Sequence, residues 1–167
     1  MRYALALAAL TSALLASALP AQAQSRAGRW QALSCDASRD VPLREQISRL
    51  PAMTEATPDS LQHLCVTHIR LSTPAPFQRL VVFQAQGSYW CGTAGCQTFI
   101  YGTDPYGAWT DISPQDTLTN AQSDEVRVNS ARAFRGMPRL AIRTGGGGAG
   151  PGVAEWGWIP RLGRYSD

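Results

Sequence analysis

Apolar residues follow a helical spacing in one segment near the start of the chain. Ser38 or Asp40 can cap the first turn, Pro42 suits that turn because an N–H is not needed there, and Pro51 ends the segment. Most charged residues fall away from the apolar positions, which are Val41, Leu43, Ile47 and Leu50. The pattern predicts a helix, followed by a loop over residues 51–60 and one helical turn over residues 59–64.

From Cys65 onward the period of the pattern changes to two. One side carries Cys65, Thr67, Ile69 and Leu71, and the other carries Val66, His68 and Arg70. Later apolar segments between turn signals predict further strands over residues 80–86, 96–101, 107–112, 125–129, 139–143 and 153–159, with a glycine loop at residues 145–148. We therefore predict an α+β fold with two disulfides, in which an N-terminal helix precedes a mostly antiparallel β-meander of five to seven strands.

The first 23 residues show the three zones of a secretory signal peptide. Arg2 precedes an apolar run from Ala4 to Leu19, and the small residues Ala21 and Ala23 fit the specificity of a signal peptidase. We expect cleavage after Ala23. The predicted location of the protein is therefore the periplasm or the exterior of the cell.

Removing these residues from the chain of 167 leaves 144, a common size for one domain. We predict a single soluble domain over residues 24–167, with a helical part at 24–64 and a β-rich part at 65–167. No later apolar run reaches the roughly 18 residues of a membrane helix. Since Cys35 lies too far from the cleavage site to accept a lipid, we expect no stable membrane anchor.

All four cysteines lie beyond the predicted cleavage site, and an even number in an exported chain indicates two disulfides. Cys91 and Cys96 favour a local bond, because Gly92 and Gly95 can adopt the positive φ angles that bring the two β-carbons together. Catalytic dithiols usually have two intervening residues at the start of a helix, whereas four residues lie here between two predicted strands, so we interpret the bond as structural. Three pairings are possible, and this one leaves Cys35 and Cys65 for the second bond.

The charges of the chain are nearly balanced. All 15 basic residues are arginines, against 12 acidic residues. Binding to a nucleic-acid backbone needs several cations on one face. The arginines of the C-terminal half alternate with apolar residues, and we interpret them as a solvated rim: Arg127, Arg132, Arg135, Arg139 and Arg143. We predict no nucleic-acid partner.

Between Leu80 and Tyr165, predicted strands lie on both sides of the predicted cysteine hairpin. An apolar strand precedes Tyr89-Trp90, Cys-Gly-x-x-Gly-Cys follows at 91–96, and a further apolar strand leads to one containing Trp109. In these features the chain resembles a group of secreted bacterial proteins, mostly of uncharacterised function. The resemblance implies a secreted β-rich module and no reaction. Many such proteins carry an acidic calcium loop, like that of integrin repeats, before the first strand, but residues 72–77 here contain no carboxylate, so no calcium site is implied.

Candidate residues for catalysis or metal binding are few. His63 and His68 are the only histidines, and zinc needs at least three protein ligands, so we predict no metal site and no cofactor. A hydrolase needs a nucleophile beside a base. Three serines could act with His68 and Asp59, namely Ser60, Ser88 and Ser130. The sequence contains no Gly-x-Ser-x-Gly signature that would mark one of them as a nucleophile. Four acids fall in or near predicted loops and show no paired-carboxylate signature, namely Asp104, Asp111, Asp116 and Glu155.

The aromatic residues are concentrated in the predicted sheet region. Tryptophans bury large areas, so we expect core or partly buried positions for Trp109, Trp156 and Trp158. Aromatic residues beside predicted turns are better placed for exposure, and these are Tyr89, Trp90 and Tyr106. Together with the hairpin glycines they form the predicted binding residues Tyr89, Trp90, Gly92, Gly95 and Tyr106.

We predict an exported binding module for a macromolecule of the cell envelope. One form is an inhibitor or immunity protein that blocks a partner protein with the rigid hairpin, which loses little entropy on binding. The other form is a glycan binder. The alternatives are a small hydrolase acting on cell-wall material and a purely structural envelope protein.

Overall fold

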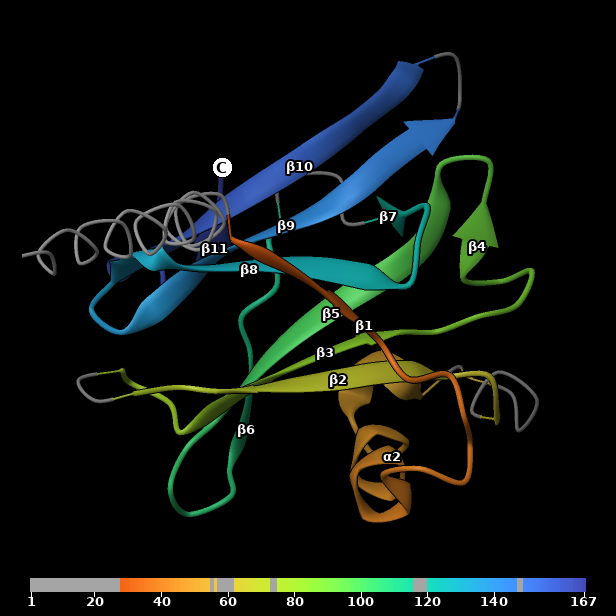
Figure 1. Ribbon diagram of the computed structural model, residues 1–167. Helices are drawn as coiled ribbons and strands as arrows, with labels where there is room; N and C mark the ends of the chain where they lie inside the picture. The colour runs from red at the N-terminus through yellow and green to blue at the C-terminus, as the bar shows by residue number, and fades with distance from the viewer. Residues whose placement is uncertain (1–27, 55, 57–61, 73–74, 116–119, 147–148) are drawn as a thin grey trace, which may run out of the picture.

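The computed structural model describes residues 28–167 except 55, 57–61, 73–74, 116–119 and 147–148. The predicted signal peptide with its cleavage site at Ala23 lies outside the described residues, and so does the first half of the predicted helical turn over 59–64. The described part is β-rich, with antiparallel sheets, one α-helix and two disulfides (Figure 1). Within it, no helix has the length and apolar character needed to cross a membrane.

The first sheet has the strand order β1-β8-β9-β10-β11, and each neighbouring pair is antiparallel. Strands β8 to β11 form a meander, as predicted, whereas β1 comes from the N-terminal part of the chain and pairs with β8. The bounds are Arg29–Ala32 for β1, Glu125–Phe134 for β8, Met137–Gly146 for β9, Ala149–Ile159 for β10 and Arg164–Ser166 for β11.

The second sheet has six strands and is centred on β5, Gly95–Thr103. Strand β3 pairs with β2 on one side and β5 on the other, while β4, β6 and β7 each pair with β5. The bounds are Cys65–Arg70 for β2, Arg79–Gln84 for β3, Cys91–Gly92 for β4, Trp109–Asp111 for β6 and Asn120–Ala121 for β7.

Two hydrophobic clusters hold the layers together. The first sheet contributes Val126, Leu140 and Trp156 to one cluster, and the second sheet contributes alternate residues such as Leu80 and Ile100. The intervening residues of the second sheet point to its other face, because successive side chains of a strand alternate. There they pack against the helix α2, Val41–Ile47, in a cluster that includes Leu43, Ile47, Val81, Phe83, Phe99 and Tyr101. Figure 1 shows α2 on this side of the second sheet.

The order of elements corrects part of the predicted fold. The helix α2 lies within the predicted segment, but β1 precedes it, and the strands form two sheets rather than one meander. The described part contains eleven strands, more than the predicted five to seven, because β1, β4, β7 and β11 are too short to show an alternating pattern. The predicted loop over 145–148 is also wrong at its start, since Gly145 and Gly146 continue β9 and Gly146 pairs with Ala149.

The start of α2 also differs from the prediction. Asp40 occupies the N-cap position with φ of 52°, and its side chain makes no capping hydrogen bond. The Ser38 hydroxyl and backbone N–H both donate to Asp36, at 2.7 and 3.0 Å, and these bonds lower the pKa of Asp36. Neither predicted cap is therefore used, because Ser38 is engaged in the preceding turn. Beyond α2, Pro51–Met53 forms a 3₁₀ turn within the predicted loop.

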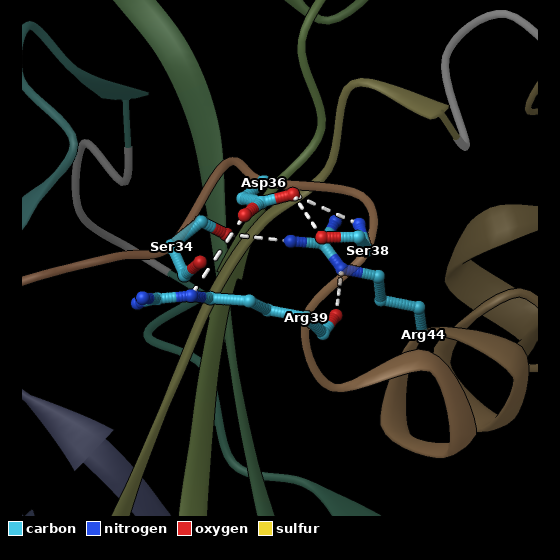
Figure 2. A network of polar contacts seen from close by, with 5 residues as sticks. All are labelled: Ser34, Asp36, Ser38, Arg39 and Arg44. Carbon is cyan, nitrogen blue, oxygen red and sulfur yellow. Dashed lines mark hydrogen bonds and ion pairs between the residues drawn. The ribbon is translucent and has the colours of Figure 1, made fainter.

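Arg44 connects α2 to the segments that carry Cys35 and Cys65. Figure 2 shows its contacts with Ser34 and Arg39. Its side chain is buried and donates to three backbone carbonyl oxygens, those of Ser34 (2.7 Å), Arg39 (2.8 Å) and Leu64. Two of these residues directly precede the two bonded cysteines in the sequence. The guanidinium and the disulfide therefore hold the same two segments. Burial lowers the pKa of Arg44, and the nearby carboxylates oppose this shift.

Candidate functional site

A cleft of about 490 Å³ opens where the ends of β2, β3 and β5 meet residues 121–124. Both disulfides reach this cleft, since Cys35, Cys65 and Cys96 line it. Its polar side chains come from three places: the end of β3, the opposite wall and the start of β2. In that order they are Gln84 and Gln86, then Gln122, Ser123 and Asp124, and finally His63. Amide, hydroxyl, carboxylate and imidazole groups therefore share the lining of the cleft with cysteine side chains and other apolar atoms.

Both predicted disulfide pairings are confirmed. Cys35 bonds to Cys65 across a sequence separation of 30, and Cys91 bonds to Cys96 across a separation of 5. The described part contains no free cysteine. Two disulfides indicate an oxidising, exported location.

Gln86 lies between the two disulfides. Its Nε2 is 3.5 Å from Sγ of Cys65, and its Oε1 is 3.2 Å from Sγ of Cys96. A disulfide sulfur carries no proton, so the second contact is a close sulfur–oxygen approach rather than a hydrogen bond. The side chain thus brings the two bonds, distant in sequence, to one place in the cleft.

A second glutamine joins the two walls of the cleft. Gln84 is 1 % exposed, and its Nε2 donates to the carbonyl oxygen of Ser123 at 2.9 Å. Its Oε1 accepts from Nε2 of Gln86 at 3.4 Å. The Ser123 hydroxyl oxygen is buried and has no hydrogen-bond partner among the described residues. The amides therefore position the wall that carries Ser123 and Asp124.

The cysteine hairpin is fixed against this wall. Gly95 has φ of 111°, and a β-carbon there would lie 2.3 Å from the carbonyl oxygen of Ala121, so the close approach requires glycine. Gln122 Nε2 also donates to the carbonyl oxygen of Thr93 in the hairpin turn at 3.1 Å. Of the two predicted binding glycines, Gly92 is exposed, whereas Gly95 packs against the backbone of Ala121 and offers no open surface to a ligand.

The two aromatic residues before the hairpin differ in exposure. Tyr89 is 66 % exposed, as predicted. Trp90 is half-buried, and its ring packs edge-on against Phe99 with 5.9 Å between centroids, so the prediction that it is exposed is wrong. The indole extends into the hydrophobic cluster beneath α2, which outweighs its position beside a turn. Trp90 anchors the hairpin, and Tyr89 lies edge-on to it at 4.8 Å.

Tyr106 does not belong to the same site. It is 94 % exposed, as predicted, in the turn after β5, where Asp104 accepts hydrogen bonds from the backbone N–H groups of Tyr106 and Ala108. The hairpin lies at the other end of β5, and this nine-residue strand spans about 25 Å. The structure therefore separates Tyr106 from the other predicted binding residues. Trp156 and Trp158 are buried and Trp109 is half-buried, so these three predictions are confirmed.

The cleft brings together a different set of polar residues from the predicted hydrolase set. Asp59 and Ser60 lie outside the described residues, while Ser88 and His68 are exposed and do not line the cleft. The cleft instead holds His63, Ser123 and Asp124. In the described part of the chain, no group of three or more histidines, cysteines or acids could hold a metal ion.

The cleft residues that were not predicted from the sequence are the two glutamines and residues 121–124. Gln84 and Gln86 alternate at the end of the predicted strand over 80–86, whose other residues are apolar, and this break in the apolar run was the available signal.

No known protein family matches the chain, and comparisons with curated proteins and with solved structures found no similar protein. The resemblance to secreted bacterial proteins therefore stays a prediction.

Proposed function

We propose that the protein is an exported binding module that takes a glycan of the cell envelope into the cleft beside the disulfide hairpin. The observation that carries this proposal is the lining of the cleft, where Gln86, Gln122 and Asp124 present amide and carboxylate groups. Sugar hydroxyls both donate and accept hydrogen bonds, and such side chains serve both roles. A mainly apolar ligand would leave these groups without partners, at a cost in free energy.

Tyr89 supplies an aromatic surface next to the cleft. Its loop begins at Gly87, which lines the cleft, and the residue is 66 % exposed. A sugar ring held by the amides can stack on this phenol. Because the neighbouring disulfide and Trp90 already order the hairpin, binding there loses little conformational entropy.

A titration of the oxidised protein with soluble peptidoglycan fragments tests the proposal, with calorimetry as the readout. We expect Tyr89→Ala to weaken binding about tenfold, which corresponds to about 1.4 kcal/mol. The matched control is Tyr106→Ala, because this residue is at least as exposed but lies at the other end of β5. No binding by the unmodified protein, or equal losses in the two variants, would contradict the assignment of the glycan to this cleft.

A protein partner is the second candidate, and the rigid hairpin favours it. The turn of the hairpin is held by the Cys91–Cys96 bond and by the hydrogen bond from Gln122 to Thr93. An inhibitor of this kind would capture its target from envelope extract in the oxidised form. The variant Cys91→Ser/Cys96→Ser should lose the capture while its circular dichroism spectrum is kept; unchanged capture would remove the hairpin from the interface.

The hydrolase alternative has less geometric support. Ser123, Asp124 and His63 line one cleft, but the Ser123 hydroxyl has no hydrogen-bond partner among the described residues. A serine nucleophile needs a base within hydrogen-bond reach. Ser123→Ala tests this alternative directly, because a hydrolase would lose turnover of cell-wall material whereas a binding module would show none before or after the change. A purely structural envelope protein would capture neither glycan nor protein in these experiments.

A further inference from the structure

The arginines of the first sheet divide into two groups. At the end near the cleft, Arg127 pairs with Glu155, and Arg143 pairs with Glu125 at 3.5 Å. The arginines toward the other end have no ion pair among the described residues. This second group, which we call the arginine end, consists of Arg132, Arg135, Arg139, Arg161 and Arg164.

Two members of the arginine end meet at a hollow of about 220 Å³. Arg132 and Arg139 line it, and Gly157 leaves its floor open, since no atom lies within 4 Å of the position of a β-carbon there. Nε of Arg139 is buried without a hydrogen-bond partner in the described part. An anionic oxygen in the hollow would supply this partner. Asp167 also lines the hollow, beside the two arginines.

Two exposed apolar side chains accompany these arginines. Phe134, at the end of β8, is 52 % exposed, and Leu162, in the turn between β10 and β11, is 45 % exposed. The guanidinium of Arg135 lies 5.7 Å from the ring centre of Phe134. Figure 1 shows the β8–β9 turn and the C-terminus at the same end of the first sheet. The β8–β9 turn requires glycine at position 136, because a β-carbon there would lie 2.7 Å from the backbone nitrogen of Ala75.

We propose that the arginine end docks on an anionic lipid bilayer. Lipid phosphates would bind the free guanidinium groups and the hollow, while Phe134 and Leu162 would insert among the headgroups. The two apolar side chains favour a bilayer over a soluble polyanion, because only lipid would remove them from water. This surface is separate from the cleft, so the inference does not depend on the proposed glycan binding.

Co-sedimentation of the oxidised protein with vesicles tests the inference. We expect binding to vesicles of phosphatidylglycerol and phosphatidylcholine, and none to phosphatidylcholine alone. Each arginine close to an anionic surface strengthens binding about fivefold, so Arg132→Gln/Arg161→Gln should weaken binding about 25-fold. The control, Arg39→Gln/Arg49→Gln, removes two exposed arginines near α2 and should leave binding unchanged.

A further variant separates lipid from other anions. Phe134→Ser should weaken vesicle binding several-fold and leave the binding of long-chain polyphosphate unaffected, because this change removes the apolar contact and no charge. Absence of binding to the anionic vesicles would overturn the inference. So would equal losses in the two arginine variants, or polyphosphate binding that depends on the arginines without any vesicle binding.

Discussion

Replacing Arg44 by methionine tests how α2 is attached to the disulfide at the cleft. Methionine keeps much of the apolar stem of arginine and removes all of its donors. The three carbonyl oxygens that accept from Arg44 then lose this partner. Because two of them belong to Ser34 and Leu64, the change acts on the segments that Cys35 and Cys65 join.

The expected loss of stability follows from the environment of each carbonyl. The Ser34 oxygen keeps its hydrogen bond from the backbone N–H of Val66, at 2.9 Å, and water can reach the exposed Arg39. Leu64 is fully buried, and leaving its oxygen without a partner costs about 1–3 kcal/mol. The lost charge-assisted bonds add to this cost. Removing the buried guanidinium offsets part of it, because burial of the charge is itself unfavourable and lowers the pKa of Arg44. We expect a net loss of about 2–3 kcal/mol in the free energy of unfolding.

Urea unfolding of the oxidised protein measures this loss. A loss of this size lowers the thermal midpoint by about 5–10 °C in a domain of this length. The control is Arg49→Met, because Arg49 is exposed just beyond α2 and should change stability by less than about 0.5 kcal/mol. A loss below about 1 kcal/mol for Arg44→Met, or one equal to the control, would show that the hydrogen bonds do not hold α2 in place.

Three further changes have expected outcomes. Gly95→Ala should lower the free energy of unfolding by about 2–4 kcal/mol, because the new β-carbon meets the Ala121 carbonyl in a strained backbone conformation; a urea midpoint like that of the unmodified protein would contradict this contact. Burial raises the pKa of Tyr101 to about 12, so the unfolded state loses this proton first, and stability should fall as the pH rises from about 10 to about 12. Tyr101→Phe should reduce that fall, as measured by urea midpoints across the range, and an unchanged slope would refute the assignment. Cys91→Ser/Cys96→Ser should cost about 2 kcal/mol, in keeping with the short loop it opens, and non-reducing urea unfolding checks this value.

Local patterns in the sequence predicted the elements that local physics decides. The alternation from Cys65 gives β2. The continuous apolar runs give β3 and β5, because these strands are buried on both faces and therefore do not alternate. The predicted disulfides follow from spacing and from an even count of cysteines. The pairing of β1 with β8 was not predictable in this way, since it joins segments about a hundred residues apart and depends on the packing of two sheets.

The candidate site was predicted on one wall only. The hairpin has a strong local signature, but residues 121–124 come into contact with it through the pairing of β5 with β7, and β7 is only two residues long. Exposure also depended on long-range packing. Trp90 and Tyr89 have the same sequence context, yet Phe99 and the helix side of the second sheet provide a buried environment for one of them only.

The two proposed contacts lie at opposite ends of β8. Glu125, at the start of this strand, follows Asp124 in the cleft, and Phe134, at its end, belongs to the surface proposed to meet lipid. Ten residues of strand span about 30 Å, several times the Debye length of about 8 Å at physiological ionic strength. The charge of a bilayer should therefore have little influence on a ligand in the cleft. Added salt should release the protein from vesicles while leaving the affinity for a neutral glycan nearly unchanged, because one contact depends on screened charges and the other on hydrogen bonds.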